Sequence, residues 1–123
     1  TIATQLARIE GLDMVVYSIG NTNDDTHLVA AGMATPEEIH AARKKGATGI
    51  IACRFIDAHG KECAVSPSDR LISAPLNRLR TASKKLLVVA GLERFAATQS
   101  AIAGDLVSHL VVDRILAEKL LGA

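Results

Sequence analysis

Runs of apolar residues alternate along the chain with segments in which apolar residues recur at helical spacing. The runs cover 14–19, 86–90 and 109–112, and the first is rich in β-branched residues and ends at Gly20. A short apolar run without polar alternation is typical of a strand in a parallel sheet, covered on both faces. We therefore expect three such strands, with 14–19 buried on both faces.

Helices are expected between and after these runs. The clearest begins at Thr35, where Pro36 and Glu38 complete a capping box, and ends at Gly46, which suits a left-handed stop position. The others are a short amphipathic helix carrying Ile2, Leu6 and Ile9, one or two helical turns over 75–82, an alanine-rich helix over 93–103, and a last helix with Ile115, Leu116, Leu120 and Leu121 on one face.

A β-hairpin is expected in the middle of the chain. Residues 49–56 predict one strand, Asp57 to Gly60 a turn, and 61–65 a shorter returning strand. Together these elements predict an α/β fold, a Rossmann-like, mostly parallel sheet with flanking helices and a hairpin, joined by right-handed crossovers.

Composition narrows the function classes. The 123 residues carry a net charge of +1 and include one Tyr, two Phe and no Trp, which argues against an electrostatic or base-stacking nucleic-acid surface. The longest apolar runs are too short to span a membrane, and the first residues lack the pattern of a secretory signal, so we expect a cytoplasmic protein. Cys53 and Cys63 lack metal-ligand spacing and predict reduced thiols, with no metal and no cofactor.

Candidate chemistry lies at the carboxyl ends of the predicted strands, where parallel sheets bind ligands. Gly20, Asn21 and Thr22 follow the first strand, and their amide and hydroxyl groups suit a polyol or a phosphate. Gly91, Glu93 and Arg94 follow the second strand, where Arg94 could hold an anion at a helix start. A structural turn and a solvated first helical turn remain alternatives. No common catalytic motif is present.

The order of these segments resembles the sugar-binding domain of SorC/DeoR-type bacterial transcriptional regulators. The resemblance runs through nearly the whole chain: Asp13 to Gly20, Ala31-Gly32-Met33, Gly46 to Gly49, Arg54 to Gly60, Val88 to Arg94, and Leu110 to Asp113 before a Leu-rich helix. It implies a fold like that of sugar-phosphate isomerases, used for sensing and not for catalysis. It also implies that residues 1–123 form the C-terminal portion of an effector domain, without the helix-turn-helix that binds operator DNA.

The sequence departs from the family pattern at two places. Leu92 and Phe95 stand where the family has a glycine and a lysine, and Ile50 stands where it often has an acidic or amide residue. These changes remove polar groups from the expected pocket, which leaves open a less anionic ligand or a weakened site. Arg94 could replace the missing cation.

The resulting prediction is an effector-binding, self-associating domain of a sugar-responsive regulator. Its ligand would be a sugar phosphate or related polyol, held by Gly20, Asn21, Thr22, Gly91, Glu93 and Arg94. Its other partners would be further copies of itself and, through a missing segment, operator DNA. The rival prediction is an isomerase-like enzyme with Glu93 or Asp25 as general base. The third prediction is a domain that serves only in assembly.

Overall fold

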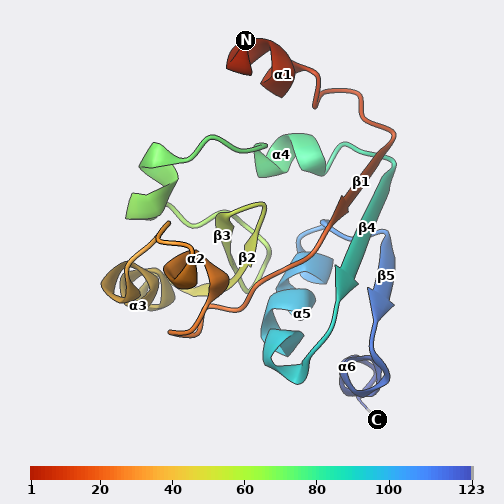
Figure 1. Ribbon diagram of the computed structural model, residues 1–123. Helices are drawn as coiled ribbons and strands as arrows, with labels where there is room; N and C mark the ends of the chain where they lie inside the picture. The colour runs from red at the N-terminus through yellow and green to blue at the C-terminus, as the bar shows by residue number, and fades with distance from the viewer. Residues whose placement is uncertain (123) are drawn as a thin grey trace.

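A parallel sheet of three strands and a separate antiparallel hairpin organise the chain in the computed structural model, which describes residues 1–122. The sheet contains β1 (Met14–Tyr17), β4 (Lys84–Val89) and β5 (His109–Val112) in the order β1-β4-β5, and the hairpin contains β2 (Ala47–Ile51) and β3 (Arg54–Asp57) (Figure 1). The prediction of an α/β fold with a parallel sheet is therefore confirmed.

Helices and 3₁₀ turns connect the strands. They are α1 (Ile2–Ala7), α2 (His27–Ala30), α3 (Pro36–Lys44), η1 (Ser66–Arg70), α4 (Leu76–Leu79), η2 (Leu92–Arg94), α5 (Phe95–Ala103) and α6 (Arg114–Leu120). The predicted capping box is present at α3, where Glu38 N donates to Thr35 Oγ1 at 3.1 Å and Thr35 N donates to Glu38 Oε2 at 2.9 Å. The helix α2 was not expected from the sequence.

The hairpin turns earlier than the sequence predicts. Residues 49–56 do not form one strand, because the chain reverses at Ala52 and Cys53, whose φ angles are +50° and +62°. Two consecutive positive φ angles define the tight turn that matches the twist of a two-stranded hairpin. The expected turn from Asp57 to Gly60 is also present, but the segment after it pairs with β3 only through a bridge between Ile56 and Glu62.

The hairpin forms a wall between two hydrophobic cores. Ile51 and Ile56 face the core beneath the parallel sheet, whereas Ile50 and Phe55 face the core formed with α2 and α3. The helix α5 lies against the hairpin so closely that a Cβ atom on Gly49 would stand 2.7 Å from Ala97 Cβ. This packing fixes the start of α5 relative to β2.

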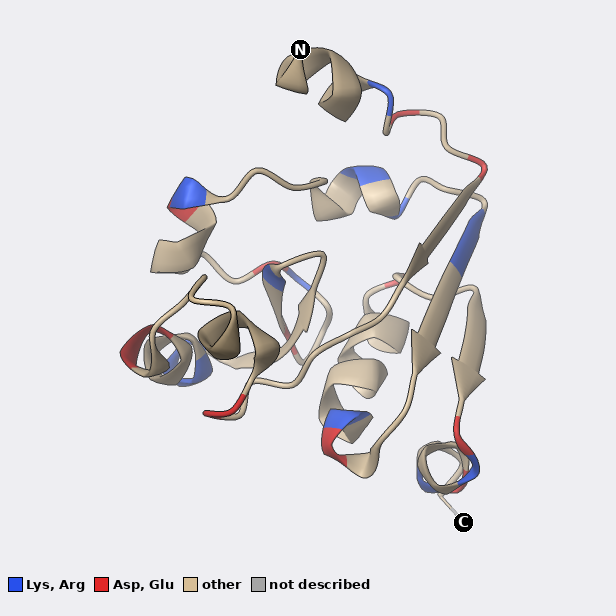
Figure 2. Cartoon of the chain, viewed as in Figure 1, with Lys and Arg blue, Asp and Glu red and all other residues tan. Residues whose placement is uncertain are grey.

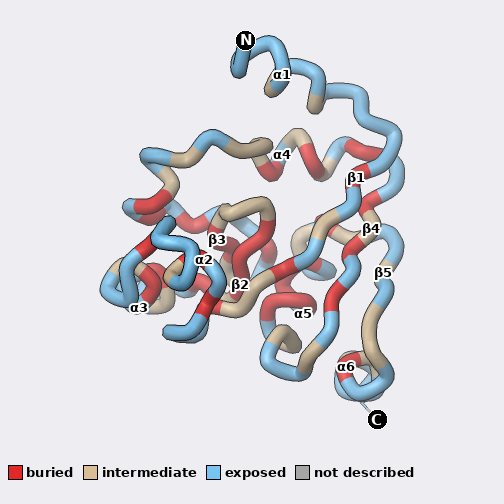
Figure 3. The backbone as a smooth tube through the Cα atoms, viewed as in Figure 1, coloured by how far each residue is buried: buried red, intermediate tan, exposed pale blue. Residues whose placement is uncertain are grey.

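One face of the parallel sheet is exposed, contrary to the prediction for 14–19. Exposed positions alternate with buried or intermediate ones along these strands (Figure 3). The side chains of Met14, Val16, Val88 and Val111 are 49%, 61%, 44% and 52% exposed. An apolar run looks the same whether a strand is covered on one face or two, so its sequence alone could not distinguish these cases.

The last helix also differs from its prediction. Leu116 is fully buried and Leu120 packs against the core, but Ile115 and Leu121 are exposed. Among residues 1–122, no helix is long and apolar enough to cross a membrane.

Candidate functional site

Two loops that follow neighbouring parallel strands meet at one cavity. The loop after β1 and the turn after β4 enclose about 310 Å³ at the carboxyl edge of the sheet. The cavity is lined by Gly20, Asn21, Asn23, Asp25, Thr26, His27, Glu93 and Arg94. This geometry brings together the two segments, one after β1 and one after β4, that the sequence predicts to hold one ligand.

The loop after β1 is anchored to the hairpin and to α3. Gly20 N donates to Ile50 O at 2.8 Å, and Ile50 N donates to Gly20 O at 2.9 Å, so a β-bridge ties the start of the loop to β2. Arg43 Nη1 donates to Thr22 O at 2.7 Å and pairs with Asp24 at 2.8 Å. Within the loop, Asn23 N donates to Asn21 Oδ1 at 3.0 Å. These bonds hold Asn21 at the cavity rim.

The turn after β4 needs a glycine. Gly91 has a φ of +103°, and a Cβ atom there would stand 2.4 Å from Glu93 Oε1. Its N–H donates to Asp113 Oδ2 at 2.6 Å, while Asp113 Oδ1 caps α6 by accepting from Leu116 N at 2.8 Å. These two backbone donors, Leu116 first, lower the pKa of Asp113. One carboxylate thus joins the ends of β4 and β5.

The structure brings together four of the six residues predicted for ligand contact. Gly20, Asn21, Glu93 and Arg94 line the cavity, whereas Thr22 and Gly91 do not. The side chain of Thr22 is buried and its hydroxyl donates to Ala47 O at 3.4 Å, so it supports the loop from within.

Sequence reasoning missed Asn23, Thr26 and His27 as lining residues, and it considered Asp25 only as a catalytic base. The polar run directly after Gly20 was the available signal. His27 begins α2, the helix that the sequence analysis did not predict.

The charged residues that line the cavity are Asp25, Glu93 and Arg94. Arg94 Nη1 contacts Glu93 Oε1 at 2.7 Å and donates to Ala90 O at 2.6 Å, so its charge is compensated within the turn. Figure 2 shows this adjacent acidic and basic pair at the start of α5. Asp25 makes no ion pair with any residue in 1–122.

The two departures from the family pattern are packed into apolar surroundings. Ile50 is buried in the core formed with α2 and α3. Phe95 packs partly buried against the other core, and the Lys119 ammonium lies 5.3 Å from its ring centre. Neither residue offers a polar group to a ligand.

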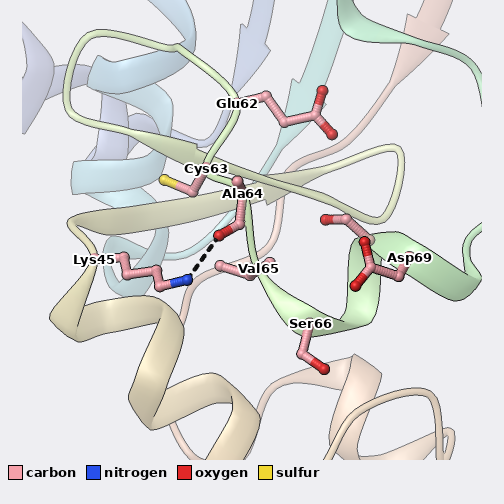
Figure 4. A pocket seen from close by; sticks show the side chains of 8 residues that line it. Lys45, Glu62, Cys63, Ala64, Val65, Ser66 and Asp69 are labelled. Atoms are coloured by element: carbon pink, nitrogen blue, oxygen red, sulfur yellow. Dashed lines mark hydrogen bonds between the residues drawn. The ribbon is translucent and has the colours of Figure 1, made fainter.

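A larger hollow lies on another part of the molecule. It measures about 640 Å³ and is lined by Lys45, Glu62, Cys63, Ala64, Val65, Ser66, Ser68 and Asp69 (Figure 4). The ammonium group of Lys45 already has a partner within the chain, because Lys45 Nζ donates to Ala64 O at 3.0 Å. Burial raises the pKa of the Cys63 thiol, which disfavours a reactive thiolate. No lining residue belongs to the parallel sheet or to the loops at its carboxyl edge, so we favour the smaller cavity.

Within residues 1–122, no group of three or more His, Cys, Asp or Glu residues is arranged to hold a metal ion. A cavity walled by polar loops at the carboxyl ends of parallel strands is typical of α/β domains that bind small ligands. The family model "Putative sugar-binding domain" matches residues 1–122, and the chain belongs to this family.

Named relatives are bacterial transcriptional regulators, which confirms the resemblance to the SorC and DeoR proteins. The transcriptional regulator YjhU of Escherichia coli (strain K12) is 31% identical over 105 residues, covering 85% of this chain and 32% of that protein. The deoxyribonucleoside regulator of Bacillus subtilis (strain 168) is 31% identical over 108 residues, covering 88% and 34%. The chain therefore spans about a third of the length of these curated relatives.

A solved structure shows the same fold. The full-length sorbitol operon regulator SorC from Klebsiella pneumoniae superposes with a TM-score of 0.86 at 25% identity, covering 98% of this chain and 39% of that one. Its match spans both the sheet and the hairpin, because nearly the whole chain is covered.

Proposed function

We propose that this domain binds a small sugar, free or phosphorylated, and that binding adjusts the DNA affinity of the regulator to which the domain belongs. Operator DNA would be bound by another segment of that regulator. A ligand shifts such an equilibrium only through its different affinity for the two states. The two loops are anchored to different parts of the fold, so a ligand that bridges them would favour one arrangement of those parts.

The observation that carries this proposal is the convergence of Asn21 with Glu93 and Arg94 on one cavity. The loops come from neighbouring strands, and both are anchored from behind, by Arg43 on one side and Asp113 on the other. Amide, carboxylate and guanidinium groups together can bond the alternating donors and acceptors of a polyol.

We favour a domain that binds the sugar without converting it over an isomerase-like enzyme. A general base must be free to take a proton. Glu93 is held by Arg94 at 2.7 Å, and Asp25 has no hydrogen-bond partner among residues 1–122 that would orient it. Incubation with aldose and ketose phosphates in a coupled assay should show no interconversion. Turnover that is lost in an Asp25→Asn variant would support the enzyme instead.

Thermal-shift measurements with Asn21 variants test the proposed site. Asn21→Ala should abolish the stabilisation given by any sugar that raises the melting temperature of the wild-type chain. Asn77→Ala is the matched control, because Asn77 is an exposed asparagine on α4, outside the cavity. Equal stabilisation of both variants would place the ligand elsewhere.

We further propose that the exposed sheet face binds a second copy of the chain. Its four large apolar side chains form a patch on the order of a few hundred Å², the size of the largest apolar patch on a typical monomer, which is often functional. Two sheets can pack face to face about 10 Å apart with their inner side chains interdigitated. Apart from Lys84 and His109 at the starts of their strands, the face carries no charge that would repel a copy of itself.

Light scattering at micromolar concentration tests this association. The wild-type chain should show the mass of a dimer, and Val88→Asp should show the mass of one chain with an unchanged far-ultraviolet circular dichroism spectrum. Ala41→Asp, on the exposed side of α3, is the control and should remain dimeric. A wild-type chain that is strictly monomeric would contradict the proposal.

A further inference from the structure

The side chains that line the cavity include more hydrogen-bond acceptors than positively charged groups. From this we infer that the domain takes an uncharged polyhydroxylated ligand, a free sugar or sugar alcohol, in preference to a sugar phosphate. The inference rests on the proposed sensing function and concerns the same cavity between the loop after β1 and the turn after β4.

The charged side chains of the cavity disfavour a phosphate. Asp25 and Glu93 contribute two carboxylates, whereas Arg94 is its one guanidinium and is already paired with Glu93 at 2.7 Å. A phosphate monoester carries about −1.5 to −2 charges at neutral pH. It would have to displace Glu93 from Arg94 and would then lie beside the two carboxylates.

The backbone amides of the two strand-end glycines and of Asn23 already have partners. Phosphate sites in such folds use free N–H groups of glycine turns and helix starts. Here Gly91 N donates to Asp113 at 2.6 Å, Gly20 N to Ile50 O at 2.8 Å, and Asn23 N to Asn21 at 3.0 Å. The two strand-end glycines therefore offer no free donor to an anion.

The groups that remain available suit hydroxyls. Asn21 keeps its amide NH₂ as a donor, Asp25 keeps both carboxylate oxygens as acceptors, and His27 adds a ring nitrogen at the start of α2. A sugar hydroxyl donates and accepts at once, so it can bridge such groups without bringing charge. The volume of about 310 Å³ fits a single small ligand.

Matched pairs of ligands test the inference by isothermal titration calorimetry on the 123-residue chain. Suitable pairs are sorbitol with sorbitol 6-phosphate, fructose with fructose 6-phosphate, and deoxyribose with deoxyribose 5-phosphate. In every pair that binds, the free member should bind at least about tenfold more tightly, since the two carboxylates of the cavity repel the charge of a phosphate. Tighter binding of the phosphorylated member would overturn the inference but leave the sensing function standing. Failure of every pair to bind at about 10 mM would overturn both.

A charge-removal variant tests the physical cause. Glu93→Gln frees Arg94 and removes one carboxylate, so it should move the preference toward the phosphorylated member by about tenfold. Glu37→Gln, which removes an exposed carboxylate on α3 outside this cavity, should leave the preference unchanged. An unchanged preference in Glu93→Gln would overturn the inference.

Discussion

A methyl group added at Gly49 should disturb the contact that holds α5 against the hairpin. The new Cβ atom of Gly49→Ala would lie 2.7 Å from Ala97 Cβ, 3.0 Å from Ala97 Cα and 3.4 Å from Ile19 Cδ1. Two of these atoms belong to a buried helix residue that has no flexible side chain to move aside. The helix or the strand must therefore shift. Glu93 and Arg94 directly precede α5, and Ile50 of β2 is bridged to Gly20, so either shift would move residues that line the candidate cavity.

The cost follows from overpacking in a filled core. Inserting a methyl group without space costs about 2 kcal/mol. For a domain of this size, that corresponds to a fall in melting temperature of about 8 °C. Differential scanning calorimetry of the wild type and of Gly49→Ala measures this fall in melting temperature directly.

A double-mutant cycle separates the contact from other effects. Ala97→Gly should cost about 1 kcal/mol, because glycine is a weak helix former. Combined with Gly49→Ala it should restore stability, because the added methyl group then occupies the space that Ala97 leaves. Ala96→Gly, at the neighbouring exposed position of α5, carries the same helix penalty and should not rescue Gly49→Ala. Simple additivity of Gly49→Ala with Ala97→Gly would refute the packing argument.

Two pH measurements follow from the structure. Burial raises the pKa of Tyr17 to about 12, so phenolate absorbance from this single tyrosine should titrate near 12 in the folded chain and near 10.0 in urea. The stabilisation is complete below pH 10.0 and is lost as the pH rises through 12; a folded-state midpoint near 10 would contradict the burial. The hydrogen bond from Arg70, with the Thr35 amide, lowers the pKa of Glu38 to about 2. That stabilisation is present above pH 4.5 and lost as the pH falls through 2, so Glu38→Gln should flatten the acid limb of the urea-unfolding profile; an unchanged slope would argue against it.

The sequence located the three strands of the parallel sheet and the helices with strong signals at their ends. The capping box at Thr35 and the glycine stop at Gly46 are formed as predicted, because both depend on local bonds. The hairpin turn at Ala52 and Cys53 was missed, since neither residue is typical of positions with positive φ. The apolar pattern of 49–56 therefore predicted one strand, although the chain reverses at Ala52 and Cys53.

The sequence predicted the two loops of the candidate site and four of its lining residues, but not the full set of side chains. The strand order that makes β1 and β4 neighbours follows from the α/β pattern, and it brings Asn21 near Glu93. The inward turn of Thr22 and the compensation of Arg94 by Glu93 depend on side-chain rotamers that no spacing rule gives. The exposed sheet face likewise depends on what covers the strands in space.

Chemical-shift mapping tests the central claim most directly. With the ¹⁵N-labelled chain titrated with sorbitol, fructose and deoxyribose, the account predicts shifts concentrated at the amides of Asn21, Asn23, Glu93 and Arg94. Shifts concentrated at Lys45, or no shifts with any of the three sugars or their phosphates, would contradict it.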